Sequence, residues 1–226
     1  FITNDASSTV AATLNQALAT GETLEVSVNG GTSYADVPDG QVSGTAVTAT
    51  ATLTAGSDNI VFRVSDAASN YGNTLTRAYT LDTTAPTIAS IAVTGVTSGQ
   101  FGNSASYTVV VTASEALAAA PTLTLATGSV AAGAGSVGDT VWTFTLTSTA
   151  GASVAHTIKV AAGGASDVAG TVTTGDSATF SWTQDTVLAT PTVVAMSTSD
   201  STPSITGTFD DGDYTEFTVV VNSVTY

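Results

Sequence analysis

The sequence predicts an all-β fold: tandem immunoglobulin-like antiparallel β-sandwich modules, with Greek-key connections, in an elongated array. Three observations predict it. Apolar side chains recur at a period of two along most of the chain, threonine and valine dominate these stretches, and turn-forming residues interrupt them at intervals typical of a sandwich. With 226 residues, the chain is long enough for about two sandwiches of roughly 100 residues each.

Taken in order, the alternating stretches are the expected strands, and each places its apolar side chains on one face. They cover residues 10–14, 24–28, 60–64, 79–81, 107–111, 142–146, 154–160 and 180–182. Clusters of turn residues at 29–31, 38–40 and 162–164 separate some of them. Trp142, Trp182 and the only histidine, His156, alternate in phase with apolar neighbours. We therefore expect these three side chains in the core, although exposed tryptophans could instead stack on a sugar.

The charge balance excludes several classes of partner. The chain carries 18 acidic and three basic residues, for a net charge of -15, so it lacks the cations that bind nucleic acid or anionic lipid and attracts cations itself. It has no cysteine, which excludes disulfides and thiolate zinc sites. No apolar run approaches the ~20 residues of a membrane helix, and no basic leader opens the chain. We expect an internal stretch of a longer protein, with any targeting signal outside it.

An internal repeat indicates the domain organisation. The segments 78–86 and 180–191 align so that Asp82 and Asp185 coincide about one sandwich length apart, and 22–28 aligns with 215–221. The alignment predicts a module lacking its first strand at 1–85, a complete module at 86–187, and the opening strands of a third, incomplete module at 188–226. Either a longer array or strands from a neighbouring chain would complete the two partial modules.

The repeat also carries a resemblance to a known family. Thr80-Leu-Asp-Thr-Thr-Ala-Pro86, preceded by Val64-Ser-Asp-Ala-Ala-Ser-Asn70, resembles the bacterial Ig-like tandem repeats of giant secreted adhesins and biofilm-associated surface proteins. The resemblance covers the whole chain, more strongly over 1–86, and Ser69 stands where the family usually has glycine. It implies a secreted or cell-surface protein that works in cell adhesion as part of an extracellular filament.

Acidic residues are placed to meet at the linker between modules. In a seven-strand sandwich the loops holding Glu115 and Asp167 lie at the end where the module begins, and Asp82 reaches that end from the preceding module. Carboxylates this close repel one another unless a cation neutralises them, and Ca²⁺ prefers such oxygen ligands. Two further sets repeat the pattern: Asp185 with Asp210, Asp211 and Asp213 at the next linker, and Asp66 with Glu22 as an equivalent half-site that would face a module upstream of Phe1. The alternative is that these side chains only cap turns or remain solvated.

These observations predict a structural spacer or extender of a bacterial surface adhesin or filament, stiffened by calcium at its linkers, and not an enzyme. No nucleophile or orienting acid accompanies His156, so no catalytic triad is expected. The alternative function is a carbohydrate-binding module. Expected partners are neighbouring Ig-like modules of the same or an adjacent chain, including a homopolymer by strand donation between 1–79 and 192–226, and surface glycans through other regions. Nucleic acid and membrane insertion are not expected.

Overall fold

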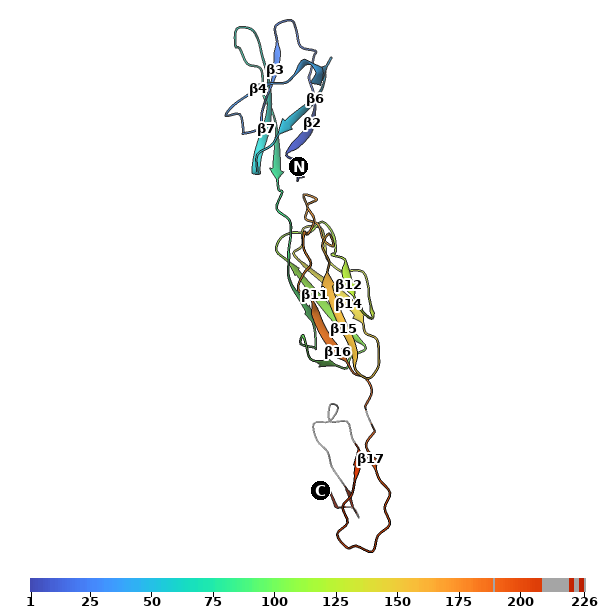
Figure 1. Cartoon of the computed structure of the whole chain (residues 1–226). Coiled ribbons are helices and arrows are strands. Elements are labelled where there is room, and N and C mark those ends of the chain that lie inside the picture. Colours follow the sequence, from blue (N-terminus) through green and yellow to red (C-terminus); the bar gives the residue numbers. More distant parts are fainter. Residues whose placement is uncertain (189, 209–219, 222–223, 226) are drawn as a thin grey trace.

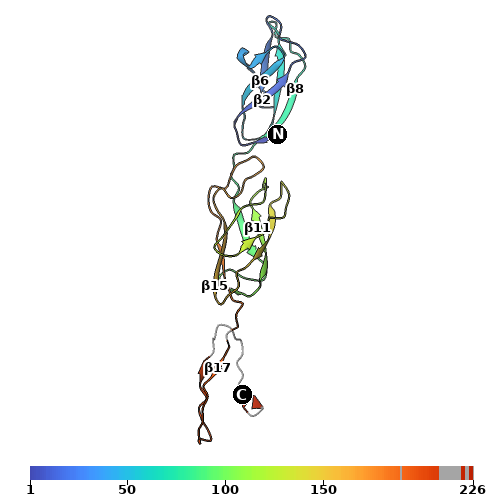
Figure 2. The same cartoon turned by 90° about the vertical axis from the view of Figure 1, so that its right-hand side faces the viewer.

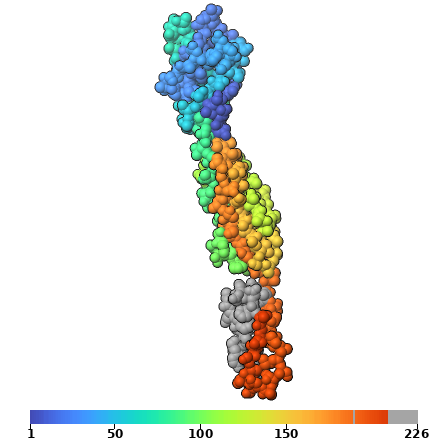
Figure 3. Space-filling model, in the orientation of Figure 1, coloured from blue at the N-terminus to red at the C-terminus, as the bar shows by residue number. Residues whose placement is uncertain are grey.

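The computed structural model describes residues 1–188, 190–208, 220–221 and 224–225, the last four by their strand assignment alone. The predicted all-β fold of tandem sandwiches is confirmed. Two sandwiches lie end to end in an elongated molecule, followed by strand β17, and a view turned by 90° shows the same arrangement (Figures 1 and 2). Figure 3 shows the sandwiches following one another along one long axis. Among the described residues, no helix is long and apolar enough to cross a membrane.

The first sandwich packs a five-stranded sheet on a three-stranded one. The larger sheet has the order β1 (Ile2–Thr3), β8 (Leu75–Leu81), β7 (Gly56–Ser65), β3 (Thr23–Ser27) and β4 (Ala35–Asp36). The smaller sheet has the order β2 (Ser7–Thr13), β6 (Ala46–Thr52) and β5 (Val42–Ser43), and a single 3₁₀ turn, Asp39–Gln41, precedes β5. Only β1 pairs in parallel, with β8. Within the described residues, β2 is therefore an edge strand.

The second sandwich has two four-stranded sheets. One has the order β10 (Phe101–Gly102), β16 (Phe180–Gln184), β15 (Val154–Val160) and β12 (Leu123–Leu125). The other has the order β13 (Ser129–Val130), β14 (Val141–Thr147), β11 (Ser106–Ala113) and β9 (Ile88–Val93). Two short hairpins follow: β17 (Thr192–Val193) with β18 (Gly207–Thr208), and β19 (Val220–Val221) with β20 (Val224–Thr225).

The sandwiches repeat one another strand by strand. Like β1, β10 pairs in parallel with the last long strand, and Thr3↔Leu81 corresponds to Gly102↔Gln184. β2 pairs with β6 over Ser7–Thr13 as β11 pairs with β14 over Ser106–Thr112. The difference is that β11 also has β9 along its other edge, where β2 has no strand in the described part of the chain. The module boundaries after residues 85 and 187 remain predictions.

Each sandwich has its own hydrophobic core. The first is mostly aliphatic and includes Leu24, Ile60 and Tyr79. The second contains Trp142 and Trp182, which are 4% and 2% exposed and so confirm the core interpretation. His156 is fully buried, stacks on Trp182 with ring centroids 4.7 Å apart, and hydrogen-bonds the Thr127 hydroxyl through Nδ1 at 2.9 Å. It is a packed structural histidine.

Candidate metal centre

The strongest candidate site lies where the first sandwich passes into the second. β8 ends at Leu81 and β9 begins at Ile88, so only residues 82–87 connect them. Both ends of this linker are fixed by backbone hydrogen bonds: Asp82 N–H donates to the Thr3 carbonyl at 3.0 Å, and Ser114 N–H donates to the Thr87 carbonyl at 2.8 Å. The anchoring holds the Asp82 backbone beside β1 at the base of the first sandwich.

Three carboxylates meet at this linker, as the sequence predicted. Asp82, Glu115 and Asp167 each offer one oxygen, and these three oxygens lie within 4.8 Å of one another. Glu115 belongs to the loop after β11 and Asp167 to the loop between β15 and β16, and an isolated bridge between Leu117 and Asp167 ties these loops together. The cluster therefore joins the end of one sandwich to two loops of the next.

Asp167 is the most buried member, with 1% of its surface exposed. Its Oδ1 accepts a hydrogen bond from Thr171 N–H at 2.8 Å, and its own N–H donates to the Thr171 carbonyl at 2.9 Å. Its Oδ2 is buried and has no hydrogen-bond partner among the described residues. Leaving a charged oxygen buried and unpaired is costly, so native proteins normally satisfy such an atom, often with an ion.

The cluster is electrostatically strained. Burial raises the pKa of Glu115 above its usual range, and the charges of Asp82 and Asp167 raise it further. The chain has only three basic side chains, and all are engaged away from the cluster. Their contacts are Arg63 with Glu25, Lys159 with Asp176, and Arg77 over the ring of Phe1. Relief of the repulsion must therefore come from protons or from a cation in solution.

The geometry fits Ca²⁺. Two oxygens bound to one calcium ion at roughly 2.3–2.6 Å lie at most about 5 Å apart, which accommodates the spacing of these carboxylates. An all-oxygen donor set suits a hard cation, and the site offers no imidazole or thiolate that would favour zinc. Asp82, Glu115 and Asp167 would be its protein ligands. Whether an ion binds here stays a prediction.

The other predicted site residues mostly behave as turn caps where the structure describes them. Asp66 accepts the N–H groups of Ala68 and Asn70 at 2.9 Å, and the Asn70 amide at 2.8 Å. The Asn70 hydrogen bonds are the main cause that lowers the pKa of Asp66. Glu22 Oε2 accepts the N–H of Ala19 at 2.8 Å. These contacts fit the alternative in which both carboxylates only cap turns. The half-site predicted from Asp66 and Glu22 therefore stays a prediction.

The second predicted linker site cannot be assembled from the described residues. Asp185 repeats Asp82: its N–H donates to the Gly102 carbonyl at 2.8 Å, and its Oδ1 accepts the N–H of Val187 at 3.0 Å. Its expected companions Asp210, Asp211 and Asp213 lie outside the described residues. A second calcium site there stays a prediction.

The strand register shows one correspondence that the sequence pattern alone did not predict. Because β2 and β11 share one register, the loop starting at Leu14 matches the loop starting at Ala113, and Gln16 stands at the position of Glu115. The shared Ala-Leu pair that follows each residue was the available signal. Asp66 and Asp167 likewise match, because the Oδ1 of each accepts a hydrogen bond from the backbone N–H of the residue four positions later. The first sandwich thus has a carboxamide where the second has a carboxylate.

No protein-family model and no curated protein matches the chain. Similar solved structures include fibronectin(III)-like modules of Clostridium thermocellum CbhA, with 14% identity and a TM-score of 0.31 over 82% of this chain and 89% of that one. Domains 4–9 of the surface layer protein SbsC match with 14% identity and a TM-score of 0.27 over 94% of this chain and 35% of theirs. Bacteroides ovatus SGBP-B, solved with a mixed-linkage heptasaccharide, matches with 11% identity and a TM-score of 0.22 over 85% of this chain and 66% of that one. We draw nothing about function from likenesses at this level.

Proposed function

We propose that this chain is a structural spacer segment of a secreted bacterial surface protein, and that calcium bound between its sandwiches restrains bending of the array. The observation that carries this proposal is the meeting of Asp82, Glu115 and Asp167 at the joint, together with the unpaired buried Oδ2 of Asp167. Acidic clusters are common on surfaces. A buried carboxylate oxygen with no hydrogen-bond partner among the described residues is uncommon, and it supports a cation as the partner of this cluster.

The mechanical effect follows from where the ligands come from. Asp82 follows the last strand of the first sandwich, whereas Glu115 and Asp167 belong to loops of the second. One ion bound to all three would link the sandwiches directly. Without it, the hydrogen bond from the Thr171 hydroxyl to the Asp82 carbonyl crosses the joint, and at 3.4 Å it is a long one. Small contacts of this kind allow domains to move relative to each other. Repulsion among the carboxylates would also push the two sandwiches apart at the joint.

A spacer needs neither catalysis nor a ligand pocket. The position of the three carboxylates, at the joint between two sandwiches, agrees with that role. The carbohydrate-binding alternative loses its main sequence support, because Trp142 and Trp182 are both buried in the core. Sugar stacking needs an exposed aromatic face. Specific binding to an immobilised glycan panel would restore that alternative.

Small-angle X-ray scattering tests the proposal directly. We expect the maximum dimension and the persistence of the rod to rise when Ca²⁺ is added to metal-free chain and to fall again on chelation. Asp167→Asn should abolish this response. Asp36→Asn, which removes an exposed acidic residue on β4 of the first sandwich, should leave it intact. Scattering curves that superpose with and without Ca²⁺ would overturn the proposal.

A further inference from the structure

A second polar side chain of the first sandwich lies at the joint, beside Asp82. Asn4 directly follows β1, and the carbonyl of the residue before it, Thr3, accepts the N–H of Asp82 at 3.0 Å. The backbone of Asn4 is therefore held next to the residue that brings the first carboxylate to the cluster.

The side chain of Asn4 extends toward the loop that carries Asp167. Gly170 N–H donates to the Asp167 carbonyl at 3.2 Å, and Gly170 has a left-handed φ of 95°. A Cβ atom placed on Gly170 would lie 3.7 Å from Asn4 Nδ2, so the carboxamide lies close to this turn. The same turn holds Asp167 Oδ1 through the N–H of Thr171. Asn4 is thus fixed beside Asp82 at one end and lies near the loop of Asp167 at the other.

Local structure does not explain why an asparagine stands at this position. Asparagine is common where its side chain caps a turn or where φ is positive. The φ of Asn4 is not positive, and its side chain makes no hydrogen bond with the described residues. Other side chains cap the adjacent turn: Asp5 N–H donates to the Thr3 hydroxyl at 3.1 Å, and Ser7 N–H donates to Asp5 Oδ1 at 2.8 Å.

The same residue type recurs at the matching place in the second sandwich. β10 pairs with β16 as β1 pairs with β8, so Gly102 matches Thr3 and Asn103 matches Asn4. The Gly102 carbonyl accepts the N–H of Asp185 at 2.8 Å, as the Thr3 carbonyl does at the first joint. The residues on both sides of the two asparagines differ between the sandwiches. The asparagine therefore recurs together with the linker aspartate, although its neighbours change.

A calcium ion at the joint needs more oxygen atoms than the three carboxylates offer singly. Ca²⁺ takes roughly six to eight oxygen ligands, and asparagine carbonyls are among those it uses in proteins. Asp82, Glu115 and Asp167 each offer one oxygen to the cluster. A carboxamide would add an oxygen without adding another negative charge to a site where like charges already repel.

We propose that Asn4 is a fourth protein ligand of the cation at the joint, through its carboxamide oxygen. A half-turn of the carboxamide exchanges its oxygen and nitrogen, so the side chain can present either atom. The inference rests on the calcium site proposed above and extends it. Asp82 and Asn4 would bind the ion from the first sandwich, and Glu115 and Asp167 from the second. Two ligands on each side would resist twisting about the long axis as well as separation, whereas a single ligand leaves a pivot.

Isothermal titration calorimetry of the full chain with CaCl₂ tests this ligand. Every sample carries Asp185→Asn, so that the site predicted at the next linker does not contribute. We expect this parent chain to bind Ca²⁺. Asn4→Leu keeps the size of the side chain but removes its oxygen, and it should weaken binding at least about tenfold, a loss that even outer partners of a metal site commonly cause. Asn4→Asp restores an oxygen donor and should bind at least as tightly as the parent.

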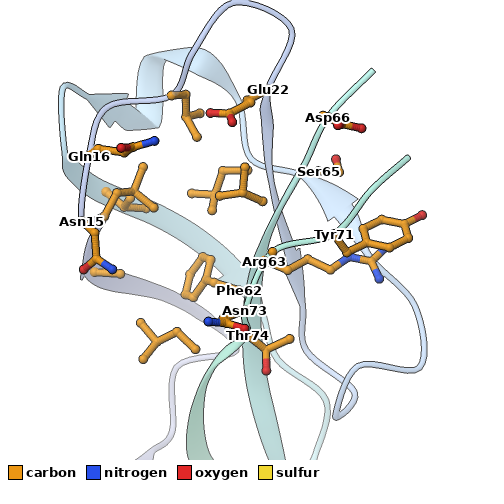
Figure 4. Close-up of a pocket in the computed structure, with 18 of the residues that line it drawn as sticks. Asn15, Gln16, Glu22, Phe62, Arg63, Ser65, Asp66, Tyr71, Asn73 and Thr74 are labelled. Atoms are coloured by element: carbon orange, nitrogen blue, oxygen red, sulfur yellow. The ribbon is translucent and has the colours of Figure 1, made fainter. Parts of the chain in front are cut away.

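Two further substitutions of asparagine serve as matched controls. Asn103→Leu changes the matching residue at the base of the second sandwich. Asn15→Leu changes an exposed asparagine that follows β2 at the opposite end of the first sandwich, beside the pocket shown in Figure 4. Both variants should bind Ca²⁺ like the parent.

The outcomes separate the role of Asn4 from the calcium proposal itself. A parent chain that binds no Ca²⁺ would overturn both. A parent chain that binds Ca²⁺, with Asn4→Leu binding equally tightly, would overturn the role of Asn4 and leave the site of three carboxylates standing. Equal weakening by Asn4→Leu and Asn4→Asp would also overturn it, because the side chain would then act by its packing and not by its oxygen.

Discussion

Replacing Asp167 by asparagine should have opposite effects with and without calcium. The substitution keeps Oδ1, so the hydrogen bond from Thr171 N–H survives. It replaces the unpaired, buried Oδ2 by an amide group that can donate to Asp82 or Glu115. Without metal, one repulsive charge therefore becomes a hydrogen-bond donor, and the variant should be at least as stable as the wild type.

The magnitudes follow from the geometry. Two like charges within 4.8 Å repel by about 1 kcal/mol even at the dielectric constant of water, and by more at a partly buried site. Removing Asp167 should therefore raise the metal-free free energy of unfolding by about 1 kcal/mol. Calcium at 100 times its Kd should add about 2.7 kcal/mol to the wild type. For a sandwich of roughly 100 residues, this shifts Tm by about 10 °C or more.

Differential scanning calorimetry in EDTA and in saturating Ca²⁺ measures both effects. We expect the variant to melt a few degrees above the wild type in EDTA and well below it in Ca²⁺. Asp36→Asn should follow the wild type in both buffers. A variant that is destabilised equally in the two buffers would refute the reasoning, because Asp167 would then act only as a loop cap.

Three further predictions concern the loops, the pH response and the core. Ser69 has a left-handed φ of 62° where Gly170 has 95° in the matching loop, so Ser69→Gly should stabilise by about 0.5 kcal/mol and Gly170→Ser should destabilise by about 1 kcal/mol, measured by urea unfolding. The pKa of Glu115 is raised in the folded chain, so the folded chain binds a proton at this residue more readily than the unfolded chain does. In EDTA, Tm should therefore rise as pH falls from 7 toward the pKa of Glu115, and Glu115→Gln should flatten this part of the profile. Tyr107→Phe removes the donor to the fully buried Gln184 Oε1 at 2.8 Å and should cost about 1–2 kcal/mol, seen as a lower urea midpoint with an unchanged m-value.

Alternation of apolar residues at period two located the long strands, because burying one face of a strand requires an apolar side chain at every second residue. The same pattern did not locate strands in which another feature changes or hides that spacing. In β9 the register shift separates Ile88 and Ile91 by three residues, so the strand did not show the expected period. In β6 the buried positions include Ala49 and Ala51, whose side chains are too small to stand out from the threonines between them. Strands of two residues, such as β4 and β13, are too short to show any period.

The candidate site was accessible to sequence reasoning through topology. Knowing which loops share an end of a sandwich was enough to bring Asp82, Glu115 and Asp167 together. The equivalence of Gln16 with Glu115 required the strand register, because Glu22 lies in the same loop and carries the expected charge. The unpaired Oδ2 of Asp167 depends on side-chain packing around one atom, which no pattern in the sequence encodes.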